Sequence, residues 1–231
     1  MLKIENLEFA YGEVDILRKV SLEGARGHIV SLMGRNGVGK TTLMRNLVGL
    51  ERPRQGKITL GENDLTPLGS YQRAKLGIGY VPQGRQIFPK LTVEENLKIG
   101  LSGRTDGRRS IPEEIYDLFP ICKEMGQRMG GDLSGGQQQQ LAIGRALAGD
   151  PQVMVLDEPT EGIQPNVIQM IGEVLRHLAR EREMIVILVE QYLDFVKGIT
   201  DDFYVMNRGQ VVASGSASEL SAEIVKKYLS V

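Results

Sequence analysis

Short apolar runs alternate with amphipathic stretches along the chain, and this pattern predicts a mixed α/β fold. Runs of strand-like character are Lys3–Phe9, His28–Met33, Lys57–Leu60, Gly77–Val81, Val153–Leu156 and Met184–Val189. Val153–Leu156 and Met184–Val189 are apolar throughout, as in strands covered on both faces by helices. Because strands that alternate with helices form sheets with parallel pairs, we expect an α/β core built on a partly parallel sheet.

Helical spacing dominates two further parts of the chain. After Pro165, one face of a helix is marked by Ile168, Ile171, Leu175 and Leu178. From about Thr92 to Leu147 the pattern is again helical, and Thr92 followed by Glu95 has the spacing of a capping box. We therefore expect a single domain, with an α/β core of about residues 1–90 and 149–231 and a helical insert of about 91–148. A hairpin is expected at 206–215, with its turn at Asn207–Gly209.

Composition narrows the class of protein. With 231 residues, 41% of them hydrophobic and 25% charged, the chain is an ordinary globular protein large enough for one core. A net charge of −1 without long blocks of like charge gives no sign of a nucleic-acid binder. Cys122 is the sole cysteine, which excludes an internal disulfide and fits a reducing compartment. With no secretory signal and no run long enough to cross a bilayer, we expect a cytosolic protein that reaches a membrane only through a partner.

The sequence GRNGVGKT, Gly34–Thr41, matches G-x-x-x-x-G-K-[ST] at every fixed position. A strand-like run precedes it and a helical pattern follows, which favours a phosphate loop over a chance glycine-rich turn. The glycines let successive N–H groups point at phosphate oxygens, and the following helix adds its positive end. Lys40 would reach the β- and γ-phosphates and Thr41 would coordinate Mg²⁺. The predicted nucleotide-binding residues of this segment are Gly34, Asn36, Gly37, Gly39, Lys40, Thr41 and Thr42.

Two carboxylates end the apolar run of VMVLDEPT, Val153–Thr160. Ligands of α/β folds bind at the C-terminal ends of strands, and neighbouring strand residues point in opposite directions. Asp157 is therefore expected in the Mg²⁺ shell, and Glu158 beside the attacking water, as its general base or to orient it. The alternative is an acidic pair that caps a helix; the phosphate loop elsewhere in the chain favours the catalytic interpretation.

The order of three motifs resembles the ATPase subunits of ABC transporters over nearly the whole chain. A phosphate loop comes first, then LSGGQ at Leu133–Gln137, then the apolar strand ending in Asp-Glu. The resemblance implies a P-loop NTPase (RecA-like) core with a parallel sheet, an N-terminal antiparallel β part, and a helical insert that carries the LSGGQ signature. It also implies a Mg²⁺-dependent ATPase, coupled to solute translocation, in which two subunits face each other head to tail.

In that arrangement the signature of one subunit covers the γ-phosphate held by the other. The resemblance assigns Ser134, Gly135, Gly136 and Gln137 to nucleotide binding across the interface. A serine hydroxyl and glycine N–H groups at a helix N-terminus suit an anion. We expect Gln138–Gln140 to continue the helix in surface and packing positions.

Further positions follow from the resemblance one at a time. Tyr11 lies where the family places an aromatic ring against adenine, with an ordinary half-buried tyrosine as the alternative. Gln83, in YVPQGRQIFPKLTVEENL, matches a glutamine that approaches Mg²⁺ and links the core to the helical insert. The segment Arg85–Asn96 would then lie near the groove that receives a transmembrane permease subunit.

The chain departs from the family pattern at two places. Gln191 occupies the position where many members carry a histidine that contacts the γ-phosphate, and the only histidines, His28 and His177, lie elsewhere. Glutamine donates a hydrogen bond but carries no charge, so we expect hydrolysis either to be slower or to rely more on Glu158. The predicted catalytic residues are Glu158, Gln191 and Lys40. Gln164 in EGIQP stands where aspartate is common, so contacts across a dimer differ there.

Both departures resemble one subgroup, the second ATPase of branched-chain amino-acid-type importers, especially its urea-importer branch. EGIQPN and VEQYLDF carry this resemblance. It implies ATP and Mg²⁺ as cofactors, a second ATPase subunit (a paralogue or another copy), permease subunits, and a position on the inner face of the plasma membrane. The alternatives are the ATPase of an exporter and a soluble ABC ATPase that acts outside transport.

Overall fold

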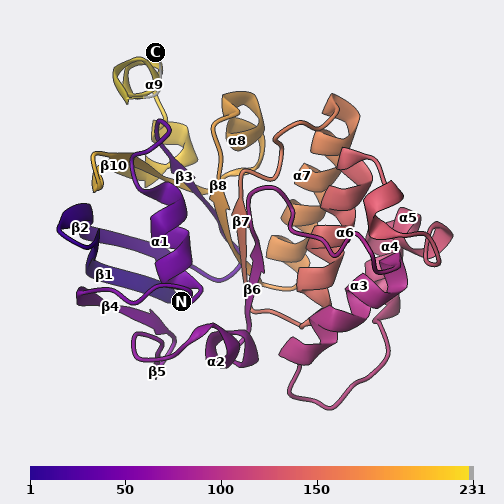
Figure 1. Ribbon diagram of the computed structural model, residues 1–231. Helices are drawn as coiled ribbons and strands as arrows, with labels where there is room; N and C mark the ends of the chain where they lie inside the picture. The colour runs from indigo at the N-terminus through magenta and orange to yellow at the C-terminus, as the bar shows by residue number, and fades with distance from the viewer. Residues whose placement is uncertain (229–231) are drawn as a thin grey trace.

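Figure 1 shows the computed structural model of the chain, which describes residues 1–228. Its larger sheet has the order β10-β9-β3-β8-β7-β6, with parallel pairing from β9 to β6 and an antiparallel β10 at one edge. These strands are β3 (Ile29–Met33), β6 (Ile78–Val81), β7 (Val153–Asp157), β8 (Ile185–Val189), β9 (Asp202–Asn207) and β10 (Gln210–Ser216). The predicted partly parallel sheet is confirmed.

A second sheet, antiparallel throughout, stands beside the first with the order β2-β1-β4-β5. Its strands are β1 (Leu2–Tyr11), β2 (Val14–Gly24), β4 (Gln55–Leu60) and β5 (Asn63–Asp64). The apolar-run pattern predicted β1 and β4 but missed β2. Buried and exposed side chains alternate along much of β2, as they do along β1.

Helices cover both faces of the parallel sheet. They are α1 (Lys40–Leu47), α2 (Ser70–Lys75), α3 (Val93–Gly100), α4 (Glu113–Leu118), α5 (Pro120–Glu124), α6 (Gly135–Ala148), α7 (Pro165–Glu181), α8 (Leu193–Ile199) and α9 (Ala222–Tyr228). In β7, Val153 and Val155 pack toward α1 and the antiparallel sheet, while Met154 and Leu156 pack toward α6 and α7. This two-sided burial explains why the β7 run is apolar throughout. Figure 1 shows α1 beside the antiparallel sheet and α3–α7 on the opposite side of β6–β8.

The segment from α3 to α6 is helical, as the pattern predicted. Thr92 caps α3: its hydroxyl accepts from the Glu95 N–H at 3.1 Å, and its own N–H donates to the Glu95 carboxylate at 2.8 Å. The predicted capping box is therefore confirmed. Helix α6 packs closely on its neighbours, since a Cβ at Gly144 would lie 3.2 Å from side-chain carbons of Leu97 and Ile115.

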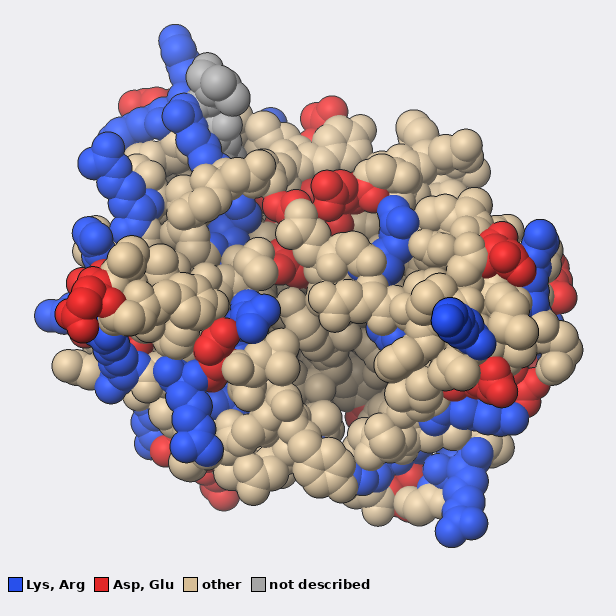
Figure 2. Space-filling model, in the orientation of Figure 1, with Lys and Arg blue, Asp and Glu red and all other residues tan. Residues whose placement is uncertain are grey.

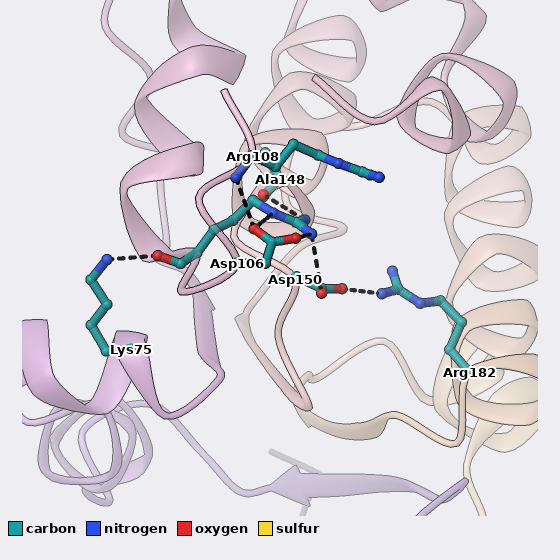
Figure 3. A network of polar contacts seen from close by, with 7 residues as sticks. Lys75, Asp106, Arg108, Ala148, Asp150 and Arg182 are labelled. Atoms are coloured by element: carbon teal, nitrogen blue, oxygen red, sulfur yellow. Dashed lines mark hydrogen bonds and ion pairs between the residues drawn. The ribbon is translucent and has the colours of Figure 1, made fainter. Parts of the chain in front are cut away.

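Polar contacts tie this helical segment to the sheet side of the molecule. Lys75 Nζ donates to the Arg104 carbonyl at 2.7 Å, and the Arg104 side chain pairs with Asp106 and Asp150. Arg182, just after α7, binds the other oxygen of Asp150. Figure 3 shows Lys75, Asp150 and Arg182 around Asp106, which lies in the loop between α3 and α4. The paired guanidinium of Arg104 holds the pKa of Asp106 well below its usual range.

The predicted hairpin is present between β9 and β10. Asn207 pairs with Gln210, so Arg208 and Gly209 form a two-residue turn, both with positive φ, 46° and 78°. Such a turn matches the right-handed twist of the strands it joins. Among residues 1–228, no helix combines the length and apolar character needed to cross a membrane.

Candidate active site

The predicted phosphate loop runs between the end of β3 and the start of α1. Gly34 has φ 149° and passes under β9, where a Cβ would lie 2.5 Å from the Met206 carbonyl oxygen. Gly39 has φ 108° at the N-cap of α1, where a Cβ would lie 3.1 Å from Leu17. Only glycine tolerates both the positive φ and the close approach of backbone at these positions. The loop is thus shaped by its own glycines and by two neighbouring strands.

Lys40 is buried at the base of this loop. Its ammonium donates to the carbonyl oxygens of Gly34 and Arg35, at 2.7 and 2.9 Å, and so holds the curl of the loop. Burial lowers the pKa of Lys40, and the nearby carboxylates of Glu158, Asp157 and Glu190 act in the opposite direction. A cation in this position can bind the terminal phosphates of a nucleotide once they enter the loop.

Asp157, the last residue of β7, is 1% exposed. Neither of its carboxylate oxygens has a hydrogen-bond partner within residues 1–228. Burial raises the pKa of Asp157, and the nearby Thr41 hydroxyl lowers it, although its geometry falls short of a hydrogen bond. Buried carboxylate oxygens without a donor, next to a hydroxyl, form a donor set that suits Mg²⁺.

Glu158 leaves the strand with φ 51° and is held by two glutamine amides. Gln83 Nε2 donates to one carboxylate oxygen at 2.9 Å, and Gln191 Nε2 donates to the other. Gln191 Nε2 also donates to Asn36 Oδ1 of the phosphate loop at 2.7 Å. Residues from four separate parts of the chain therefore meet around one carboxylate.

A pocket of about 350 Å³ lies in front of these groups. Its lining is Ile16, Asn36, Gly37, Gly39, Lys40, Thr41, Thr42, Gln83 and Glu158. Eight of these nine lining residues are ones that the sequence nominated; Ile16, from β2, is the addition. Gln191 joins the pocket through its bonds to Glu158 and Asn36. The arrangement can bind a polyanion and its metal and hold a carboxylate near the terminal phosphate.

Tyr11 does not line this pocket. Its ring packs edge to face on Phe9, its hydroxyl donates to Glu51 at 3.2 Å, and 46% of the residue is exposed. An exposed ring leaves room for a flat ligand to stack on it. The adenine role of Tyr11 stays a prediction.

The signature residues also lie outside the pocket, at the start of α6. Ser134 and Gln137 satisfy each other: the hydroxyl accepts from the Gln137 N–H at 3.4 Å, and the Gln137 side-chain oxygen accepts from the Ser134 N–H at 2.9 Å. This is a second capping box, whose S-x-x-Q spacing was visible in the sequence but was not used in the prediction. Of the glutamines that follow, Gln139 and Gln140 are buried, in packing positions as expected.

Sequence reasoning missed one acidic residue at this site. Glu190 follows β8 directly, is 3% exposed, and accepts hydrogen bonds from Thr160 on one oxygen and from the N–H groups of Gln191 and Tyr192 on the other. The same argument that selected Asp157, a carboxylate at the C-terminal end of an apolar strand, applied to Glu190 as well.

Comparison with known proteins defines the class. A family model described as "ABC transporter" matches residues 17–161, a span that includes the phosphate loop, the signature and the two carboxylates after β7. The chain therefore belongs to the ABC transporter family, as an ATP-binding subunit that hydrolyses ATP.

Individual relatives agree with this assignment. The high-affinity branched-chain amino acid transport ATP-binding protein BraG of Pseudomonas aeruginosa is 38% identical, over 99% of each chain. The lipopolysaccharide export system ATP-binding protein LptB of Haemophilus influenzae is 35% identical, over 98% of this chain and 95% of LptB. Among solved structures, a nucleotide-free ATP-binding cassette from an ABC transporter has a TM-score of 0.83 at 29% identity, covering 100% of this chain and 95% of its own. A dimeric cassette bound to ADP and Pi has a TM-score of 0.84 at 26% identity, covering 94% and 99%.

Proposed function

We propose that the chain powers the import of a small solute by closing on a second ATPase subunit over bound ATP and Mg²⁺. The observation that carries this proposal is the separation of two half-sites: the pocket at the phosphate loop gathers Lys40, Gln83 and Glu158, whereas the signature at Ser134 lies outside it. A second subunit placed head to tail would bring its own signature over that pocket. A similar cassette was solved as a dimer bound to ADP and Pi, which supports the pairing of two ATPase subunits.

Within this proposal each residue at the pocket has a distinct task. Lys40 and the N–H groups of the loop bind the β- and γ-phosphates. Thr41, Asp157 and the Gln83 side-chain oxygen would hold Mg²⁺, which neutralises charge on the transferring phosphoryl group. The undonated oxygens of Asp157 support this choice of ligand. The amide nitrogen of Gln83 is engaged by Glu158, which leaves its oxygen free to face the cation.

Glu158 is proposed to orient and deprotonate the attacking water. Gln191 holds its carboxylate and ties it to Asn36, so the base is positioned relative to the phosphate loop. A proton taken from water would reside on Glu158 until product release. Both hydrogens of the Gln191 amide are used by Asn36 and Glu158, so Gln191 would have to release one of these bonds to donate to the γ-phosphate, and it would do so without the charge that histidine supplies.

A groove on the molecule supports docking to permease subunits. This hollow of about 430 Å³ lies between β6 and α2 on one side and α3 and α6 on the other, and its apolar rim includes Leu50, Phe88 and Ile99. These three residues are 50%, 45% and 38% exposed. Figure 2 shows a hollow in the middle of the front face, and the side chains that line it are mostly uncharged. An exposed apolar groove of this kind fits a helix of a partner.

One arginine links this groove to the pocket. Arg145 of α6 donates to the carbonyls of Gln86 and Arg85, at 2.8 and 3.2 Å, and its guanidinium lies 5.4 Å from the centre of the Phe88 ring. Burial lowers the pKa of Arg145. A movement of a docked helix would therefore reach the loop that follows Gln83 through packed, hydrogen-bonded groups.

The transported solute is proposed from relatives. Similarity to BraG favours branched-chain amino acids, and the sequence resemblance extends this to urea and short amides. The similarity to LptB keeps an exporter as the second candidate, since LptB serves lipopolysaccharide export. In either case the subunit would work on the inner face of the plasma membrane through its permease partners.

Glu158→Gln tests the proposal. The variant should bind ATP and Mg²⁺ with the affinity of the parent chain, lose hydrolysis, and accumulate as closed dimers at twice the 25.5 kDa of the chain in size-exclusion chromatography with light scattering. Exposed Glu173 on α7 offers a matched control, Glu173→Gln, that should behave as the parent. Hydrolysis at the parental rate in Glu158→Gln would place the base elsewhere.

A further inference from the structure

Glu190 lies at the centre of a buried set of hydrogen bonds that no assigned role explains. It is 3% exposed and sits where β8 ends, between the loop after Glu158 and the loop that starts at Gln191. A buried carboxylate costs several kcal/mol in desolvation unless hydrogen bonds compensate for it. Its partners therefore decide what the residue does.

Each carboxylate oxygen of Glu190 serves a different loop. Oε1 accepts from the backbone N–H of Thr160 at 3.0 Å and from the Thr160 hydroxyl at 2.5 Å. Oε2 accepts from the backbone N–H groups of Gln191 and Tyr192, at 2.8 and 3.2 Å. One rigid planar group thus joins the two loops through four hydrogen bonds.

The two loops carry the groups that meet at the pocket. Thr160 lies two residues after Glu158 in a turn whose first N–H, that of Glu158, donates to the Val189 carbonyl at 2.9 Å. Glu158 starts this turn with φ 51°, a backbone conformation that residues other than glycine rarely adopt unless contacts with the surrounding structure stabilise it. Glu190 and its neighbour Val189 supply that support from β8.

We propose that Glu190 is a positioning residue for ATP hydrolysis. It holds the turn of Glu158 against the loop of Gln191, so that the Gln191 side-chain amide keeps its hydrogen bond to the Glu158 carboxylate. The inference rests on the roles proposed above for Glu158 and Gln191. It adds that their contact is set from beneath the pocket by a third residue that touches neither nucleotide nor water.

The chemistry explains why a carboxylate is needed. Three of the four groups that point at Glu190 are backbone N–H groups, which only donate. An ionised carboxylate accepts on both oxygens, whereas an amide accepts on one and donates from the other. Glutamine at this position would therefore face at least one N–H with its own NH₂ and would release one loop.

Four variants test the inference: Glu190→Gln, Glu190→Asp, Thr160→Val and Thr160→Ser. Thr160→Val removes the hydroxyl but keeps the side-chain shape and the backbone N–H, and Thr160→Ser keeps the hydroxyl. We measure the Kd of a fluorescent ATP analogue and the kcat of ATP hydrolysis on the full-length chain, with Glu158→Gln alongside. The Thr160 pair keeps the test decisive if a Glu190 variant fails to fold.

A misplaced reactive group lowers kcat while leaving binding intact, and a displacement of about 1 Å costs up to about 100-fold. We expect Glu190→Gln to lower kcat at least tenfold with Kd within about threefold of the parent, and Thr160→Val to lower it about fivefold. Thr160→Ser should restore the rate to within about twofold, and Glu190→Asp should fall between Glu190→Gln and the parent.

A double variant separates positioning from a general structural role. Because both changes break the same clamp, Thr160→Val with Glu190→Gln should lose no more activity than Glu190→Gln alone. The inference would be overturned if the kcat loss of the double variant equalled the product of the two single losses. Parental kcat in both Thr160→Val and Glu190→Gln would overturn it as well. If hydrolysis disappears in Glu158→Gln while these variants stay active, Glu190 has no positioning role and the proposed function stands. Parental hydrolysis in Glu158→Gln would remove both proposals.

Discussion

The phosphate-loop pocket and the signature loop differ in what surrounds them. At the pocket, side chains from separate parts of the chain converge, and three carboxylates, those of Asp157, Glu158 and Glu190, act on Lys40. At the signature, Ser134 and Gln137 form hydrogen bonds with each other, and neither bonds to a carboxylate among residues 1–228. The side chains of the pocket therefore come from one chain, whereas the signature is a capped helix N-terminus, which in the proposed dimer would bind an anion held by the other subunit.

Individual glycines of the two loops differ in how closely other atoms approach them. At Gly37 a Cβ would meet no atom within 4 Å, so this side of the phosphate loop is open. At Gly135 and Gly136 a Cβ would lie 3.2 Å from atoms of Arg85 and Val167. The Arg85 guanidinium beside Gly135 also donates to the Glu161 carbonyl at 3.0 Å, so a positive charge already stands next to the signature. A second subunit's phosphate would meet favourable charge there.

The largest effect is expected at the phosphate-loop pocket. Lys40→Ala removes the buried cation that holds the loop and that is proposed to bind the β- and γ-phosphates, so we expect ATP affinity to fall at least about 100-fold and hydrolysis to vanish. Titration with a fluorescent ATP analogue measures the change. Lys57→Ala, at an exposed lysine of β4, is the control. Unchanged affinity in Lys40→Ala would show that the nucleotide binds elsewhere.

A change at the signature should separate binding from hydrolysis. Ser134→Arg places a long side chain where, in the proposed dimer, the other subunit's phosphate would approach, while the pocket of its own chain stays intact. We expect ATP affinity within about threefold of the parent and hydrolysis reduced about 100-fold. Ser134→Ala removes only the capping hydroxyl and costs about 1 kcal/mol of helix stability. A proportional loss of ATP affinity in Ser134→Arg would mean that the two half-sites overlap within one chain.

Gln191→His sharpens the electrostatic side of the comparison. An imidazole that titrates near pH 6.5 adds positive charge beside the γ-phosphate, so we expect the rate to rise about two- to fivefold, more at pH 6.5 than at pH 8. The ratio of the Gln191→His rate to the parental rate is measured by steady-state hydrolysis at each pH value. If this ratio were the same at both pH values, the side chain at position 191 would contribute no charge to the transition state.

The smallest effect on activity is expected at Cys122, which is 2% exposed in α5. Burial raises the pKa of the Cys122 thiol to about 12, so almost none of it is thiolate at pH 8. We expect a maleimide to label folded protein at least about 100-fold more slowly than unfolded protein, with hydrolysis unchanged in Cys122→Ala. Rapid labelling of the folded chain would contradict this burial. A cysteine-free active chain would then accept new thiols at the pocket and the signature.

Prediction from sequence was strongest where contacts are local. The phosphate loop follows from a contiguous pattern, and Asp157 and Glu158 from the end of an apolar strand. The bonds from Gln191 to Asn36 and Glu158 join residues far apart in sequence, so only the fold reveals them.

The sequence analysis missed Glu190. Its place directly after an apolar strand was a local signal, but the sequence next to Glu190 does not show that Thr160, 30 residues earlier, donates to it. The S-x-x-Q capping box at Ser134 was a local signal and could have been recognised with the one at Thr92. Local signals were therefore available for Glu190 and for the Ser134 capping box, and only the long-range hydrogen bonds required the fold.

Mixing two inactive variants tests the central claim, that a pocket and a signature from different chains form one site. Lys40→Ala supplies an intact signature, and Ser134→Arg supplies an intact pocket. In an equimolar mixture half the pairs are mixed, and each mixed pair holds one intact site of two, so activity should recover to about a quarter of the parental rate if sites act independently. Hydrolysis that stays at the level of the separate variants would contradict a site shared between two copies of this chain.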